Sequence, residues 1–316
     1  MASVVFPRRT ELHRAALAAS TLDKYTRATR KFIQWCRENG EDARTVPELD
    51  ELLNEYTHHC WEFGGNKSNA VNALWGTIHF LFGVHSYQFP MTLRCLKGWN
   101  KLQPSQPWAP LTWEQACVIA VHFTLRGRFD MAVGCLLAFD CLLRNGEMTH
   151  LHVADIAFES DPRIGSSFPD VGLRLRKTKG GPNQYTKLRR PEVKDLLREW
   201  ISTRHGSMLF DFTSDDFRRV FRAICNDLGF SNMYVPHSLR HGGATDLWLL
   251  TRDLDRVMIA GRWKSKRSAR HYIQDCCALL MALSILPSVT SAGKAFASDI
   301  RRALALAVAR SGGGGL

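Results

Sequence analysis

The chain has 316 residues, which is enough for about two ordinary domains, each with its own core. Its 45% hydrophobic content is typical of globular proteins and excludes a wholly disordered chain. The formal net charge of +12 favours a polyanionic partner. Residues 106–316 carry 29 Lys and Arg against 20 Asp and Glu, so most of the excess positive charge lies C-terminally.

The cysteine and histidine patterns favour an intracellular protein without a metal site. Nine cysteines occur without a CxxC pair, which indicates reduced thiols. His58-His59-Cys60 lacks a second ligand pair at zinc-site spacing. Residues 1–8 lack a secretory apolar region, and the apolar stretches 131–143 and 276–287 are too short to span a bilayer. We expect no membrane association, and a nuclear location in a eukaryote or a cytoplasmic or nucleoid location otherwise.

Residues 20–102 are predicted to form a small all-helical domain behind an N-terminal extension of residues 1–19. Ser20 to Asp23 has the pattern of a helix start with a capping-box-like carboxylate. Basic residues then share one face of the first helix, either as a solvated surface or as a binding surface: Lys24, Arg27 and Lys31. Further helical patterns cover residues 52–63, 69–84 and 91–102.

A proline-punctuated linker, residues 103–110, leads to a larger domain at residues 111–287. Its first helix is predicted over 112–124, capped by Thr112 and Gln115, and its second over 128–150. Strands are predicted at 151–157, 171–176 and 184–188, and helices resume at Pro191. The predicted fold is therefore mainly α with a small antiparallel β-sheet.

The C-terminal segment, residues 288–311, contains an Ala-rich helical pattern over 292–310. Its apolar face would either cover its own domain or bind a neighbouring molecule. Residues 312–316 are mostly glycine and are expected to form a flexible tail.

Two arginines are suited to holding a phosphate. Phosphodiester cleavage concentrates negative charge on the non-bridging oxygens, and a planar guanidinium can grip two oxygens while staying protonated. Arg144 lies in an apolar stretch with Glu147 at i+3, although a helix-surface ion pair is the plainer interpretation. Arg240 follows His237 at i+3 near a predicted helix start, where a phosphate is favoured. HxxR alone is common, but the whole string 236–245 is much more specific.

Tyr272 has the most basic surroundings of the tyrosines and lies nine positions after Trp263. A phenol with a pKa of about 10 needs nearby cations and a base to act as a nucleophile. The segment before it supplies four cations: Lys264, Lys266, Arg267 and Arg270. A tyrosine packed on a core helix is the plainer alternative.

Lys179 is predicted in the hairpin turn 179–183, where it could reach a leaving oxygen as a general acid. Lys177 is two residues away and could serve equally, and an exposed turn lysine without a role is the alternative.

In combination, these motifs resemble the tyrosine recombinase (phage integrase-like, Cre-like) family. The resemblance covers residues 20–285 and rests on six residues in the family's order: Arg144, Lys179, His237, Arg240, Trp263 and Tyr272. The family's lysine usually occupies the hairpin between its second and third strands, and Lys179 follows Thr178 as expected for it. The strings 240–245 and 261–265 look closer to recombinases of eukaryotic mobile elements, such as the DIRS-like group, than to the bacterial chromosome-dimer resolvases.

The resemblance implies a two-domain, C-shaped clamp around duplex DNA, with residues 20–102 as the SAM-like core-binding domain. Tyr272 would form a 3′-phosphotyrosyl bond, releasing a 5′ hydroxyl. Arg144, Arg240 and His237 would hold the phosphate. Trp263 would donate its indole N–H to the phosphate. Two residues would support the catalytic side chains from behind: Glu147 and His241.

The resemblance further implies strand cleavage and religation without metal, ATP or another cofactor. It implies a homo-oligomer on DNA, with a dimer on one site, a tetrameric synapse and the C-terminal helix as a candidate for exchange between protomers. The predicted DNA-binding residues are Lys24, Arg27, Lys31, Lys264, Lys266, Arg267 and Arg270.

Two alternative functions stay open at this stage. A type IB topoisomerase would use the same chemistry without synapsis, although the linker and small N-terminal domain favour a recombinase. A domesticated DNA-binding protein would keep the fold without cutting, although every catalytic position that we can place holds a competent residue. Chance motifs in a basic helical protein would not explain the ordered set of six.

Overall fold

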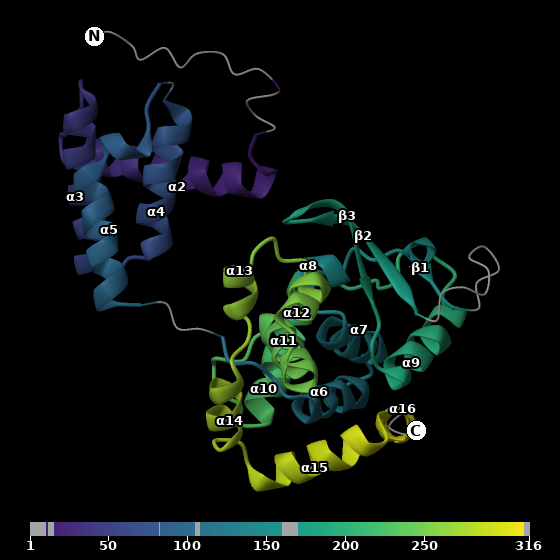
Figure 1. Ribbon diagram of the computed structural model, residues 1–316. Coiled ribbons are helices and arrows are strands. Elements are labelled where there is room, and N and C mark those ends of the chain that lie inside the picture. The colour runs from purple at the N-terminus through teal and green to yellow at the C-terminus, as the bar shows by residue number, and fades with distance from the viewer. Residues whose placement is uncertain (1–10, 12–15, 82, 105–107, 160–169, 313–316) are drawn as a thin grey trace. The chain divides into compact units, whose positions relative to one another are not determined.

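The computed structural model describes residues 11, 16–81, 83–104, 108–159 and 170–312. The chain divides into two compact units, unit 1 with residues 1–106 and unit 2 with residues 107–316 (Figure 1). Within the described residues, none of the helices has the length and apolar character needed to cross a membrane.

Unit 1 is all-helical, as predicted. Its helices are α2 (Ala19–Glu38), α3 (Val46–Glu62), α4 (Lys67–Phe80), η1 (Ser86–Gln88) and α5 (Pro90–Leu102). They enclose a core that includes Phe32, Leu53, Leu74, Phe89 and Trp99. The buried Asp50 carboxylate accepts hydrogen bonds from the backbone N–H groups of Met91 and Thr92, which joins α3 to the start of α5.

The predicted cap at the start of α2 is wrong. The helix begins at Ala19, and its N-cap, Ala18, makes no side-chain hydrogen bond. Because the helix has already begun, Ser20 lies inside the first turn and cannot cap it. Asp23 instead forms an exposed ion pair with Arg27 at i+4.

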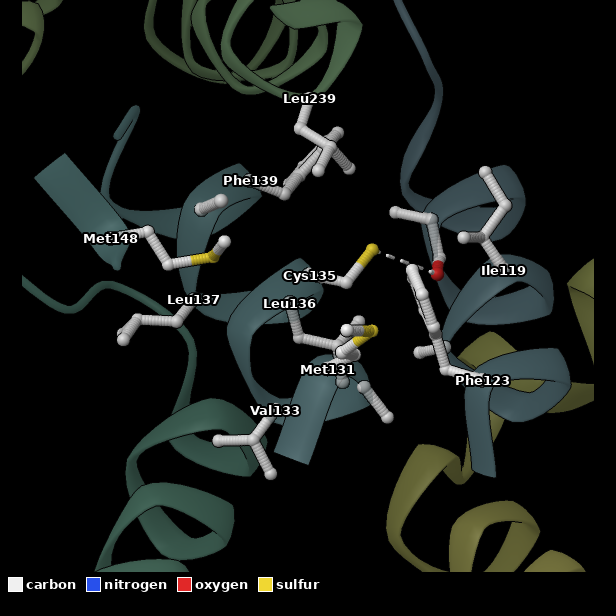
Figure 2. Packing of buried hydrophobic residues seen from close by; sticks show 14 of the residues in the cluster. Ile119, Phe123, Met131, Val133, Cys135, Leu136, Leu137, Phe139, Met148 and Leu239 are labelled. Carbon is white, nitrogen blue, oxygen red and sulfur yellow. Dashed lines mark hydrogen bonds between the residues drawn. The ribbon is translucent and has the colours of Figure 1, made fainter. Parts of the chain in front are cut away.

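Unit 2 is built around α6 (Trp113–Leu125) and α7 (Phe129–Asp140), which are buried along most of their length. The remaining helices are α8 (Asn145–Met148), η2 (Val153–Asp155), α9 (Pro191–Ser202), α10 (Ser214–Asp227), α11 (His237–Thr251), α12 (Leu254–Gly261), α13 (Lys266–Arg270), α14 (Asp275–Ala282), α15 (Pro287–Ser298) and α16 (Ile300–Gly312). The predicted capping box of Thr112 and Gln115 starts α6. Figure 2 shows part of this core, to which Phe123 of α6, Phe139 of α7 and Leu239 of α11 all contribute.

The sheet is antiparallel and three-stranded, with the order β1-β2-β3. The strands are β1 (Ile156–Ala157), β2 (Gly172–Thr178) and β3 (Gly181–Lys187). The predicted first strand, 151–157, is thus mostly wrong, because residues 153–155 form a 3₁₀ turn. The predicted hairpin is present, but its turn is tighter than expected and consists of Lys179 and Gly180. Pro182 is accommodated within β3 because this strand is an edge.

The predicted helix 128–150 is wrong as a single element. α7 ends at Asp140, Leu142 adopts a left-handed conformation (φ 52°), and Arg144 is extended as the N-cap of α8. The chain breaks here because guanidinium groups from distant segments bind the carbonyl oxygens of Cys141 and Leu142. Arg144 therefore lies in a turn rather than inside a helix.

The predicted helix 292–310 is also two helices, because Asp299 breaks it between α15 and α16. The apolar side of α16 packs on its own unit, with Ile300, Leu304 and Ala307 buried in the core of unit 2. Arg301 adds ion pairs with Asp195 and Glu199 of α9. In this arrangement the C-terminal segment covers its own domain.

Candidate active site

Arg240 lies at the centre of a cluster of functional side chains in unit 2. Its side chain is fully buried, and its guanidinium donates to the carbonyl oxygens of Leu142 and Gly261. The guanidinium also lies over the rings of Trp263 (4.7 Å) and Tyr272 (5.4 Å). Burial, together with the neighbouring Arg144 and Arg262, lowers the Arg240 pKa to about 9. Arg240 thus joins α11 to the turn after α7 and to the end of α12.

Glu147 is the carboxylate that balances this cationic cluster. It accepts hydrogen bonds from the backbone N–H and the guanidinium of Arg144, and its Oε2 lies 3.7 Å from Arg240 Nη1. Burial alone would raise the Glu147 pKa, but Arg262, Arg144 and Arg240 outweigh burial and lower it. The carboxylate therefore stays ionised. Arg144 keeps a quarter of its side chain exposed and can still reach a ligand.

Arg262 is a member of this cluster that the sequence interpretation missed. Its guanidinium, 5% exposed, donates to the carbonyl oxygens of Cys141, Leu142 and Ala260 and to Glu147 Oε2 at 2.8 Å. It lies directly before Trp263 in a left-handed conformation (φ 59°). That adjacency was the available signal, but a basic residue in a basic segment gives no sign of burial.

The Tyr272 ring is packed among the other predicted residues of the site. It stacks on His241 with ring centroids 4.5 Å apart, and it lies 4.5 Å from the Trp263 ring and 5.5 Å from the His237 ring. The tyrosine is partly exposed, so its hydroxyl group is not sealed in the core. Thr245 Oγ1 donates to the Tyr272 carbonyl and accepts from the Gln274 N–H. The α11 helix therefore fixes the loop that carries the tyrosine.

Two histidines beside the tyrosine are held in the neutral form. Burial is the main cause, followed by Arg240 and Arg144 for His237 and by His237, His271 and Arg240 for His241. The His237 pKa falls to about 4 and the His241 pKa to about 3. Both imidazoles can therefore accept a proton or donate a hydrogen bond without carrying charge at neutral pH.

Several buried nitrogen atoms in this cluster have no hydrogen-bond partner among the described residues. They are Arg240 Nε, His241 Nδ1, Arg262 Nε and Trp263 Nε1. Unsatisfied buried polar atoms are costly and rare, so four in one small region indicate a place built for a polar ligand. Three of the four are N–H donors, which suits an anion.

Other predicted residues lie outside this cluster. Lys179 and Lys177 are exposed on the β2–β3 hairpin, and no contact among the described residues brings either against Tyr272. Four basic residues around α13 are exposed, and Lys266 forms an ion pair with Asp255: Lys264, Lys266, Arg267 and Arg270.

Unit 1 has a basic groove of about 900 Å³ between its helices. The predicted residues Lys24, Arg27 and Lys31 line it, together with Lys67 at the start of α4. The amide-bearing residues Asn66, Asn69, Asn72, Asn100 and Gln103 also line it. Hence the basic face that sequence assigned to α2 is one wall of a concave polar surface.

Unit 2 is similar in sequence to a known protein family. Residues 127–276, the greater part of unit 2, match the model of the phage integrase family. No curated protein matches the chain in the sequence comparison.

The solved structures share the fold at low sequence identity. The Tn1549 transposon integrase in complex with transposon right end DNA has a TM-score of 0.61 and 14% identity, covering 86% of this chain and 96% of that one. A lambda integrase dimer bound to a COC′ core site has a TM-score of 0.57 and 16% identity, covering 84% and 74%. The XerH recombinase bound to its difH substrate has a TM-score of 0.51 and 20% identity, covering 75% and 68%.

The family match includes Arg144, His237, Arg240, Trp263 and Tyr272, which are the residues that unit 2 gathers into one cluster. Residues 127–276 are therefore similar to the phage integrase family, whose members are tyrosine-type site-specific recombinases.

Proposed function

We propose that this protein is a site-specific recombinase that cuts and rejoins duplex DNA through a covalent 3′-phosphotyrosyl intermediate on Tyr272. The observation that carries the proposal is the packing of the Tyr272 ring against Trp263, His237 and the Arg240 guanidinium, beside unpaired buried donors. A scissile phosphate in this position would meet the nucleophile and the donors at once.

The phosphate is bound by three cationic or neutral donors and the indole. Arg240 offers its unpaired Nε–H, and Trp263 offers its unpaired Nε1–H. Arg144 supplies a second guanidinium from the α8 N-cap, where its partly exposed side chain can swing toward a ligand. His237 contributes a neutral imidazole at the first position of α11. These groups stabilise the negative charge that develops on the non-bridging oxygens.

In the cleavage step the Tyr272 oxygen attacks the phosphorus atom and the bond from phosphorus to the 5′ oxygen breaks. The phenol proton passes to a base, for which His237 is the candidate because its imidazole is neutral and its ring lies 5.5 Å from the tyrosine ring. Lys179 gives a proton to the departing 5′ oxygen, for which the exposed hairpin turn must move toward the site. Religation reverses these transfers, and the covalent bond conserves the energy of the phosphodiester, so ATP is not consumed.

DNA binding would involve both units. Lys24, Arg27 and Lys31 line the groove of unit 1, and the exposed cations around α13 flank the tyrosine. The structural relatives include a lambda integrase dimer bound to its core site. We propose that this chain likewise acts as a homo-oligomer on duplex DNA, with a tetramer at synapsis.

The experiment that tests the proposal is a covalent-trapping assay on a nicked duplex made from the DNA that flanks the coding sequence. Cleavage beside the nick releases a short oligonucleotide, so religation fails and the protein remains attached. We expect a protein–DNA adduct that resists denaturation with the wild type and not with Tyr272→Phe. If both proteins bind this duplex and neither forms an adduct, the proposal is wrong and a DNA-binding protein that does not cut takes its place. Relaxation of supercoiled plasmids lacking this site would instead favour a type IB topoisomerase.

A further inference from the structure

We propose that Arg262 is a positioning residue whose charge keeps Glu147 from capturing Arg240, and that this leaves the Arg240 guanidinium available for the scissile phosphate. The inference rests on the proposed function above. It assigns a role to a residue outside the predicted catalytic set, and it follows from how the acceptor atoms of one buried carboxylate are shared.

The two oxygens of Glu147 are divided among three arginines. Oε1 accepts from the Arg144 guanidinium, while Oε2 accepts from the Arg144 backbone N–H at 2.9 Å and from Arg262 Nη2 at 2.8 Å. Arg240 Nη1 lies 3.7 Å from the same Oε2, beyond hydrogen-bond distance. Since an sp² oxygen has two lone pairs, Arg144 and Arg262 together occupy those of Oε2.

Arg262 is held in place by main-chain acceptors as well as by Glu147. Its other donors bind the carbonyl oxygens of Cys141, Leu142 and Ala260, and the side chain is 5% exposed. Burial lowers its pKa and Glu147 opposes that change, so the two groups stabilise each other's charged form. If Arg262 moved away from Glu147, both groups would remain as unpaired buried charges, which is costly.

Removal of the Arg262 charge would free one lone pair of Oε2. Arg144 already pairs with Oε1, so Arg240, at 3.7 Å from Oε2, is the cation that could take the freed position. Both Arg240 and Glu147 are buried, so their attraction is little screened. A direct pair would shift the Arg240 guanidinium by about 1 Å away from its position over Tyr272, and misplacement of that size costs about 100-fold in rate.

The test uses four variants in the full chain: Arg262→Met, Arg262→Lys, Glu147→Gln and the double variant Arg262→Met/Glu147→Gln. The single-turnover rate of adduct formation is measured at saturating nicked duplex, beside the dissociation constant and the urea midpoint. We expect Arg262→Met to lose about 100-fold in rate with little change in DNA affinity. Arg262→Lys should restore most of the rate, because an ammonium also neutralises Glu147.

The double variant makes the decisive comparison. If Glu147 captures Arg240 when Arg262 is absent, then removing the Glu147 charge should restore activity, so the double variant should cleave about tenfold faster than Arg262→Met. A purely structural role for Arg262 predicts the opposite, namely that the two losses accumulate. Double-variant activity at or below that of Arg262→Met would overturn the inference, as would equal losses in Arg262→Lys and Arg262→Met.

Arg189 offers a matched control. It is also a mostly buried arginine, 17% exposed, that donates to a main-chain carbonyl at the end of α7 and pairs with a carboxylate of α11, but it makes no contact with Glu147 among the described residues. Arg189→Met should lower the urea midpoint as Arg262→Met does while leaving the cleavage rate nearly unchanged. An equal loss of rate in Arg189→Met would show that destabilisation explains the effect.

A readout without DNA separates this inference from the proposed function. In proton–nitrogen correlation spectra, the Arg240 Nε–H signal, assigned by its disappearance in Arg240→Lys, should move in Arg262→Met and return in the double variant. If that pattern appears but the wild type forms no adduct, the charge arrangement holds and the cleavage proposal fails. If the wild type forms the adduct but neither the signal nor the rate changes in Arg262→Met, this inference is wrong and the cleavage proposal stands.

Discussion

The glycine pair Gly242-Gly243 on α11 allows a close helix contact on which the site depends. A Cβ atom at position 243 would lie 2.0 Å from the carbonyl oxygen of Phe139, near the end of α7, whereas ordinary contacts are 3.4–4 Å. A Cβ atom at position 242 would lie 2.0 Å from the carbonyl oxygen of Leu111. Both obstacles are backbone atoms, so no side chain can rotate away to make room.

We predict that Gly243→Ala destabilises unit 2 by about 3 kcal/mol, the upper end of the usual range for overpacking, because α7 and α11 must separate by more than about 1 Å. The same separation would pull Arg240 from the carbonyl oxygen of Leu142, so the cleavage rate at saturating DNA should fall about 100-fold. Urea unfolding followed by tryptophan fluorescence measures the first effect, and the trapping assay measures the second.

Gly146 provides the matched control within the same unit. It lies in α8 with nothing within 4 Å of its Cβ position, and its φ is not positive. Gly146→Ala should therefore stabilise the unit by about 0.4–1 kcal/mol, because alanine lowers the conformational entropy of the unfolded chain. If Gly243→Ala unfolds at the same urea concentration as Gly146→Ala, the spacing of α7 and α11 does not depend on this glycine and the reasoning is refuted.

Three further predictions concern the hairpin, the histidines and the groove of unit 1. Lys179→Ala should lose cleavage on ordinary DNA and recover it when the leaving 5′ oxygen is replaced by sulfur, since a thiolate departs without a proton; Lys177→Ala is the control, and rescue of that variant instead would reassign the general acid. Because the His241 pKa is lowered from 6.5 to about 3 in the folded protein, its contribution to the free energy of unfolding is fully present above pH 6.5 and declines as the pH falls. Between pH 7 and pH 5 this contribution should drop by about 2 kcal/mol, and urea midpoints that decline equally in His241→Gln would contradict it. Lys31→Ala, in the groove, should reduce the salt dependence of DNA binding by about one phosphate contact, whereas Lys97→Ala, exposed on α5 outside the groove, should not; equal salt slopes for the two variants would remove the groove from the interface.

Much of the site could be predicted because its parts are close in sequence. His237 and Arg240 are one helical turn apart at the start of α11, so local geometry alone places them on one side. Trp263 and Tyr272 are joined by a short helix whose cap, Ser265, is visible in the sequence. The hairpin was recognisable from its alternating pattern, although period-two patterns do not specify where the turn begins.

The unpredicted parts depend on contacts between distant residues. The arginine after Gly261 looks like one more surface cation in a basic segment, and only the approach of Glu147 from α8 makes its burial favourable. The break of the C-terminal helix at Asp299 has the same character, because the Ala-rich pattern continues on both sides of it. Helical periodicity predicts each helical segment, but it does not identify the distant residues whose contacts bend the chain between two segments.

The turn after α7 shows how the site itself shapes the fold. Leu142 is a non-glycine residue with φ 52°, a conformation that costs about 1 kcal/mol or more. Its carbonyl oxygen accepts from both Arg240 and Arg262, and hydrogen bonds to charged donors contribute about 1.5–3 kcal/mol each. These bonds offset the strain, whereas without them the apolar run 131–143 would favour a continuing helix. The break that brings Arg144 to the N-cap of α8 is therefore produced by the same guanidinium groups for which we propose roles in binding the phosphate or positioning its partners.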